Sequence, residues 1–135
     1  MAWQAVAGGA NGVLFWCFHH PYWKLSAEDF AQFQSDYAAV GAEVREFIPI
    51  LLLPEAEERI LSVPATMSAR VWTDAGRTYL LVCNLTREDV AGDIWLSGWY
   101  ASLQRLLDGG ESEVDGGRVP VTLPPLGVGL FALTD

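Results

Sequence analysis

The residues best suited to chemistry lie together near the start of the chain, directly after a short apolar run. Residues 12–18 read Gly-Val-Leu-Phe-Trp-Cys-Phe, and two histidines, a proline and two aromatic residues follow at 19–23. Imidazole, phenol and indole groups can form hydrogen bonds, and their rings can stack on a flat ligand. Five side chains are therefore candidate ligand contacts: Trp16, His19, His20, Tyr22 and Trp23.

The two histidines do not by themselves predict a metal site. His19 and His20 are adjacent, so they lack the i, i+4 spacing of a helical ligand pair, and no third ligand is apparent. Neighbouring residues on a strand point to opposite sides, so at most one of the two would face a common site. The sequence predicts neither a metal nor another cofactor.

Paired carboxylates are the other chemistry that the composition could supply. Glu28 and Asp29 are adjacent, but they lie at the start of a predicted helix, where capping and the helix dipole explain both. Glu111, Glu113 and Asp115 lie in a glycine-rich segment that is typical of a solvated loop. We therefore assign no catalytic residue within this chain.

Helices and one buried strand are expected to position these side chains. Residues 2–10 read as the end of a helix, because alanines precede a glycine pair that can cap it, and the run 12–18 reads as a buried strand. The clearest element is a helix over Ser26–Phe47, which Ser26 caps and Pro49 should end or kink near Phe47. Its apolar stripe consists of Phe30, Phe33, Tyr37, Val40, Val44 and Phe47.

After Pro54 the pattern changes from helical to β-type. A charged segment at 55–59 reads as a linker, and short β-type runs then alternate with glycine and proline turns. The predicted strands are 68–73, 78–84, 93–96, 102–107, 119–123 and 128–133, with turns at 74–76, 108–110 and 115–117. The fold class is α+β: residues 1–56 form an incomplete helix–strand–helix domain and residues 57–135 an antiparallel β-sandwich, with 78–84 central. We expect Trp95 and Trp99 in the sandwich core; the alternative is an exposed carbohydrate-binding platform.

The distribution of charge bears on two points: whether the chain binds nucleic acid, and why residues 1–23 carry no charged side chain. The net charge is −9 and no basic cluster exists, which argues against nucleic acid. Residues 1–23 carry no charged side chain. Their polar residues, glycines and prolines make a membrane span a poor interpretation, and a basic start typical of a signal peptide is lacking. We expect no membrane partner, and the cellular compartment stays open.

Two further features concern single side chains. Cys17 and Cys83 lie in apolar strand-like runs, so we expect buried free thiols rather than a disulfide. The triplet Asn84-Leu85-Thr86 matches the N-glycosylation sequon, a common triplet that matters only in a eukaryotic secretory chain.

The order of these segments resembles the C-terminal end of retaining glycoside hydrolases built on a (β/α)8 barrel with an appended β-sandwich. The matching stretches are AWQAVAGGANGVLFWCF at 2–18, YLLVCNLT at 79–86, LQRLLDGG at 103–110 and VTLPPLGVGLFAL at 121–133. The resemblance implies that residues 2–7 end the seventh barrel helix, 12–18 form the eighth strand and 26–47 the eighth helix. It also implies that the catalytic carboxylates lie on earlier strands, upstream of Met1.

On this resemblance, the candidate contacts follow the eighth strand, at the end of the barrel where active sites lie. Trp16, Tyr22, Trp23 and one of His19 and His20 would then contact a carbohydrate substrate. The alternatives are core packing for Trp16, a barrel-rim or interdomain contact for Tyr22 and Trp23, and a loop position bonded to backbone for the histidines. The expected partners are carbohydrate and either the missing N-terminal barrel portion or a second copy bound through residues 1–23. Two alternative functions stay open: a non-catalytic carbohydrate-binding module and a free-standing oligomeric interaction protein.

Overall fold

A computed structural model describes residues 2–10, 26–107 and 111–135 of the chain. It contains two helices, α1 (Ala2–Ala7) and α2 (Ala27–Leu51), and a short 3-10 turn, η1 (Glu57–Arg59). Six strands follow: β1 (Ile60–Ser62), β2 (Met67–Asp74), β3 (Arg77–Asn84), β4 (Val90–Arg105), β5 (Glu111–Leu123) and β6 (Val128–Thr134). The predicted strand at 12–18 and the turn at 108–110 lie outside the described residues.

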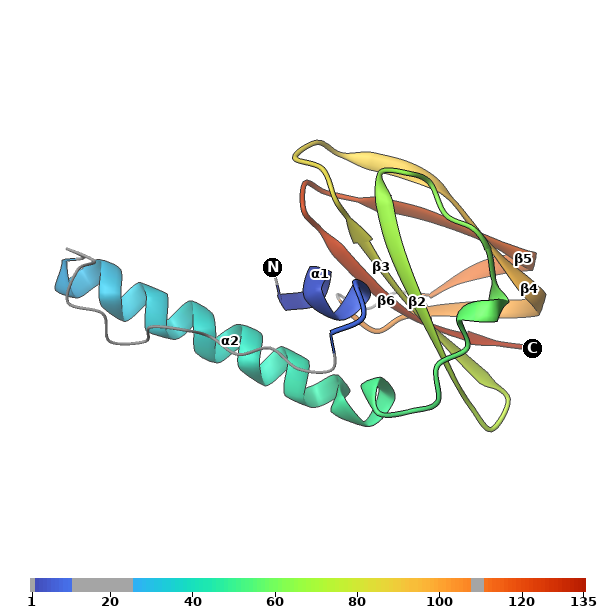
Figure 1. The fold of residues 1–135 in the computed structure, drawn as a ribbon, viewed down its shortest axis with the longest axis horizontal. Coiled ribbons are helices and arrows are strands. Elements are labelled where there is room, and N and C mark those ends of the chain that lie inside the picture. The colour runs from blue at the N-terminus through green and yellow to red at the C-terminus, as the bar shows by residue number, and fades with distance from the viewer. Residues whose placement is uncertain (1, 11–25, 108–110) are drawn as a thin grey trace.

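The strands form one antiparallel sheet that curls into a nearly closed, barrel-like sandwich (Figure 1). Its order is β1-β4-β6-β3-β2, and β5 pairs with β4. The predicted α+β fold with an antiparallel sandwich is confirmed, and β3 has the predicted interior position between β6 and β2. The division into domains at residue 56 stays a prediction.

Alternation along the strands builds two apolar layers. On β3, Leu80 and Val82 point into the sandwich, whereas Leu81 and Cys83 point to the outer face. The inner layer is completed by β4 and β5. The outer layer packs against α1 and the C-terminal part of α2, so β3 is buried on both faces. This explains why its sequence is a nearly continuous apolar run.

Helix α2 begins as predicted and ends later than predicted. The Ser26 hydroxyl accepts a hydrogen bond from the Asp29 N–H at 3.0 Å, and the Asp29 carboxylate accepts one from the Ser26 N–H, which completes a capping box. The helix does not end at Phe47 but continues through Pro49 to Leu51. A proline in the last turn removes one backbone donor, and the Leu52 N–H still bonds to the Ile48 carbonyl.

Two sequence predictions about the β-region are wrong. The predicted strands 93–96 and 102–107 belong largely to one long strand, β4, and the predicted turn at 115–117 lies inside β5. The β4–β5 ladder runs through this region with register shifts around Tyr100, where Gly116 has a φ of 72°. Gly116 and Gly117, which the sequence predicts in a turn, therefore lie in a β-bulge.

The segment 55–59, predicted as a linker, packs against the sheet. The Ala56 N–H donates to the Val71 carbonyl at 2.9 Å, and Ala56 itself is buried. Arg59 reaches into the sandwich and donates to the Thr78 hydroxyl and the Tyr100 phenol oxygen, both at 3.2 Å. These contacts fix the path between α2 and β1.

Asn84 closes the end of β3 with a fully buried carboxamide. Its amide nitrogen donates to the carbonyls of Glu88 and Pro124, and its oxygen accepts from the Thr86 N–H and hydroxyl, all at 2.7–2.8 Å. Every hydrogen-bonding position of a carboxamide is thereby used. The side chain ties the β3–β4 connection to the β5–β6 connection.

Cys83 is a free, fully buried thiol, as predicted, whereas Cys17 lies outside the described residues. Burial raises the pKa of Cys83 from its ordinary value of 9.0 to about 12. The folded chain therefore holds this proton more tightly than the unfolded chain does. Its contribution to stability is complete below pH 9.0 and is lost as the pH rises from there toward 12.

We predict that Cys83 resists thiol reagents in the folded chain. In a Cys17→Ser variant, where Cys83 is the remaining thiol, modification by Ellman's reagent at pH 8 should be on the order of a hundredfold slower than in denaturant, because the reactive thiolate is both scarce and covered. Equal rates in buffer and in denaturant would contradict the buried position.

Candidate functional site

The candidate site lies where α1 meets the outer face of the sheet. The N–H groups of Gly8, Ala10 and Gly9 donate to the carbonyls of residues 4, 5 and 6 at 2.9–3.0 Å, and Gly9 has a φ of 96°. This is a Schellman ending, in which a glycine adopts the left-handed conformation that L side chains avoid. It turns the chain sharply at the sheet surface.

Strand β2 completes the C-terminal cap of α1 with two side chains. The Ser68 hydroxyl donates to the Ala7 carbonyl at 3.3 Å, and Arg70 Nη1 donates to the Val6 carbonyl at 2.9 Å. A guanidinium at this end also interacts favourably with the negative end of the helix dipole. Residues more than 60 positions apart thus hold α1 on the sheet.

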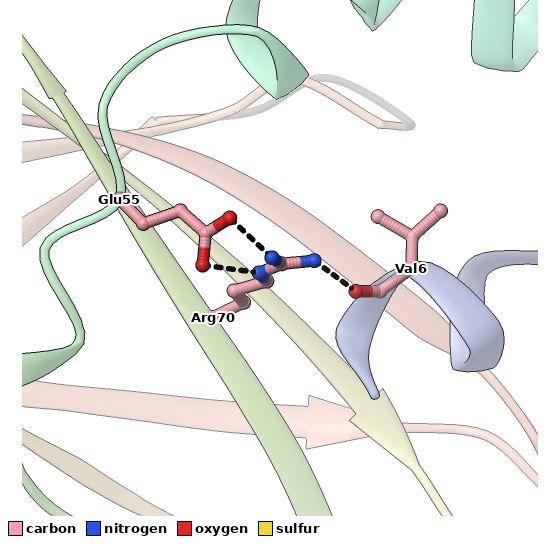
Figure 2. A network of polar contacts seen from close by, with 3 residues as sticks. All are labelled: Val6, Glu55 and Arg70. Atoms are coloured by element: carbon pink, nitrogen blue, oxygen red, sulfur yellow. Dashed lines mark hydrogen bonds and ion pairs between the residues drawn. The ribbon is translucent and has the colours of Figure 1, made fainter. Parts of the chain in front are cut away.

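Arg70 links three segments through one guanidinium (Figure 2). Its Nε donates to Glu55 Oε2 at 3.1 Å, its Nη2 pairs with Glu55 Oε1, and its Nη1 bonds to Val6. The Arg70 side chain is 7% exposed and the Glu55 side chain 40% exposed. The Arg70 guanidinium also lies 5.5 Å from the ring centroid of Trp72. This bidentate pair fixes the orientation of the arginine as well as its position.

Helix α2 joins the same cluster through its C-terminal half. The Trp3 indole N–H donates to Glu43, and the Trp3 and Phe47 rings lie 6.1 Å apart in a tilted arrangement. Phe47 is the buried member of the predicted apolar stripe, and the other members are partly buried. Figure 1 shows the N-terminal half of α2 extending away from the sheet.

A cavity of about 580 Å³ lies between the two helices and β2. Apolar side chains dominate its lining, among them Val6, Val44 and Leu53, while Arg45, Arg70 and Glu55 supply its charged groups. The Trp72 indole N–H is buried and has no hydrogen-bond partner among the described residues. The geometry is that of a packing interface with unfilled apolar space.

The tryptophans expected in the sandwich core are exposed instead. Trp95 is 44% and Trp99 68% exposed, so the core prediction is wrong for both. Ile94, Leu96 and Tyr100 are the buried residues of this part of β4, and the residues between them are exposed. Trp72, by contrast, is buried on β2 beneath the helices.

The five candidate contacts of the sequence, Trp16, His19, His20, Tyr22 and Trp23, all lie outside the described residues. Glu28 and Asp29 lie in the first turn of α2, and Asp29 forms the capping box as expected. Sequence reasoning missed Arg70 and Glu55. The signal was an arginine within the β-type run 68–73, where its neighbours Val71 and Trp72 are apolar.

Some features are absent from the described part of the chain. No three histidine, cysteine, aspartate or glutamate side chains among residues 2–10, 26–107 and 111–135 are grouped so that they could hold a metal ion. Neither described helix is long and apolar enough to cross a membrane.

The fold is one that occurs within glycoside hydrolases. An Anoxybacillus α-amylase is 18% identical over 83% of this chain and 24% of its own, with a TM-score of 0.54. AmyP, solved with maltose, is 14% identical over 82% of this chain and 22% of its own, with a TM-score of 0.56. The Geobacillus thermoleovorans α-amylase GTA, solved with acarbose, is 16% identical over 68% of this chain and 21% of its own, with a TM-score of 0.53.

The chain spans less than a quarter of the length of each of these structures. No family model and no curated protein matches the sequence. The likeness therefore defines the fold of the chain.

Proposed function

We propose that this chain is the C-terminal part of a glycoside-hydrolase-type protein, in which the β-sandwich supports a (β/α)8 barrel by holding its last helices. The observation that carries the proposal is the Arg70 cluster: one guanidinium binds the end of α1, the segment that leaves α2, and the sheet. The fold shared with α-amylases supports the same assignment.

On this proposal, α1 is the end of the seventh barrel helix and α2 is the eighth barrel helix. Their apolar surfaces pack against the sheet on one side, through Trp3, Phe47 and Trp72. The upstream barrel would supply the catalytic carboxylates, and Trp16, Tyr22, Trp23 and one of His19 and His20 would contact the substrate where the eighth strand ends. The substrate class is carbohydrate, and because the neighbours were solved with maltose and acarbose, an α-glucan is the first candidate.

The direct test is the reading frame that precedes the Met1 codon. A barrel of ~250 residues needs roughly 1 kilobase of coding sequence upstream. An open frame with repeated strand–helix units, and with acidic residues at the ends of two strands, is the expected result. A stop codon directly before Met1 would contradict the proposal.

The proposal also predicts that the 135-residue chain does not hydrolyse glycosides. Glycoside hydrolysis needs two carboxyl groups about 5–10 Å apart across the scissile bond, and we assign neither to this chain. The measurement is the release of nitrophenol from chromogenic glycosides. Robust turnover by the purified chain would show that the carboxylates lie within it.

A second candidate is a non-catalytic carbohydrate-binding module, and the exposure of Trp95 and Trp99 favours it. The third alternative, self-association through residues 1–23, is tested by concentration-dependent sedimentation. In that stretch, four residues of α1 are already buried within the chain: Ala2, Trp3, Val6 and Ala7.

A further inference from the structure

Two exposed tryptophans lie on β4, away from the helices. Trp95 and Trp99 are flanked along the strand by the buried residues Ile94, Leu96 and Tyr100. The β4–β5 register shifts between them, because Trp95 pairs with Arg118 and Tyr100 with Gly116, so β4 carries extra residues in a bulge here. Helix α1 contacts β2 and β3 instead, so the helix interface and this face are separate surfaces.

The backbone beneath Trp99 holds its ring in place. A Cβ atom on Gly116 would lie 3.4 Å from Cζ3 and 3.5 Å from Cε3 of Trp99, so the six-membered ring lies over the β5 backbone. On the inner side of β4, the Tyr100 ring occupies the space beside Gly98, whose φ is 135°. Large aromatic residues therefore flank the bulge, and the exposed Trp99 ring contacts the β5 backbone at Gly116.

Polar groups flank the tryptophans. Arg118 is the cross-strand neighbour of Trp95 on β5, and its Nε bonds to the Asp93 carboxylate at 2.9 Å. Ser62 on β1 is the neighbour on the other side. Among the described residues, neither exposed indole N–H has a protein acceptor. The surface therefore offers flat apolar rings together with hydrogen-bond donors, which is the combination that a sugar chain needs.

We infer that Trp95 and Trp99 form a binding platform for a glycan chain, with Arg118 as a hydrogen-bonding neighbour. This inference names the surface for the proposed carbohydrate role and does not depend on a barrel. A stable protein partner needs about 800 Å² from each side, whereas a whole tryptophan supplies 150–250 Å². Trp95, at 44% exposed, and Trp99, at 68% exposed, fall short of that area together. A linear sugar chain can bind through contacts in which single sugar rings pack on single aromatic rings.

The test is affinity electrophoresis of the 135-residue chain in gels that contain soluble starch, an α-glucan. The wild-type chain should be retarded. Trp95→Ala and Trp99→Ala should each weaken binding roughly three- to tenfold, and the double variant should migrate as it does without starch. Trp99→Phe, which keeps a flat ring, should retain part of the retardation. Leu85→Ala, a substitution of an exposed apolar residue between β3 and β4, is the matched control and should bind as the wild type does.

The outcomes separate this inference from the proposed function. If the wild type is retarded and the double variant equally so, carbohydrate binding stands but the platform is overturned. If the wild type is not retarded, the platform is overturned, and the upstream reading frame still decides the barrel proposal. Near-ultraviolet circular dichroism of each variant confirms that a loss of binding is not a loss of fold.

Discussion

Glu55→Gln is expected to lower the free energy of unfolding by about 2–3 kcal/mol, because it leaves the buried Arg70 guanidinium without its countercharge. Breaking a fully buried pair from one side costs about 3–5 kcal/mol. Glu55 is 40% exposed, so water compensates part of that loss. Urea unfolding followed by circular dichroism measures the difference.

Two further variants make this prediction specific. Glu57→Gln removes an equal charge from the exposed η1 turn and should change the free energy of unfolding by less than about 0.5 kcal/mol. Adding Arg70→Met to Glu55→Gln should recover part of the loss, since the uncompensated charge is then gone. A double variant less stable than Glu55→Gln alone would show that the arginine stabilises the chain chiefly through Val6 and Trp72.

Gly117→Ala is expected to destabilise the sandwich by about 3 kcal/mol or more. A Cβ atom at this position would lie 2.1 Å from the Leu96 carbonyl oxygen and 3.2 Å from that of Gly98. Both are backbone atoms of β4, so no side chain can move aside, and β4 and β5 would have to separate at the bulge. The midpoint of thermal or urea unfolding reports the loss.

Gly41→Ala is the matched glycine control. Gly41 lies within α2, and beyond its chain neighbours and the backbone of its own helix no described atom lies within 4 Å of the Cβ atom that alanine would add. Alanine is the better helix former by about 0.5–1 kcal/mol, so this variant should be as stable as the wild type or more stable. Similar losses in the two variants would mean that the close approach at Gly117 is not what matters.

Local signals predicted the elements that depend on local physics. Ser26 and Asp29 predicted the start of α2, and the glycine pair after residue 7 predicted the end of α1. The continuous apolar run of β3 predicted a buried strand. The predicted turn at Gly116 and Gly117 was wrong for an equally physical reason. A glycine permits a left-handed residue in a turn or in a bulge, and the pairing partner, which lies far away in sequence, decides between them.

The site was less predictable, because its residues meet only in the folded chain. Arg70 and Glu55 are 15 positions apart, and Val6 lies another 49 positions earlier. Trp95 and Trp99 are aromatic residues of the kind that usually fill a core. They are exposed because Ile94, Leu96 and Tyr100 already occupy the inner positions of β4. Hydropathy alone predicts that an aromatic residue is buried, whereas the pairing register of its strand decides whether its side chain points into the core or to the solvent.

The buried carboxamide of Asn84 bears on the choice of expression host. In a eukaryotic secretory pathway the Asn84-Leu85-Thr86 triplet is an acceptor for a glycan, yet in the folded chain its amide nitrogen is inaccessible and fully bonded. Modification and folding therefore exclude each other at this residue. Secreted material would divide into a folded, unmodified fraction and a glycosylated fraction in which β3 cannot close against the β5–β6 connection. An Asn84→Asp substitution would not rescue the yield, because it replaces the two N–H donors by acceptors.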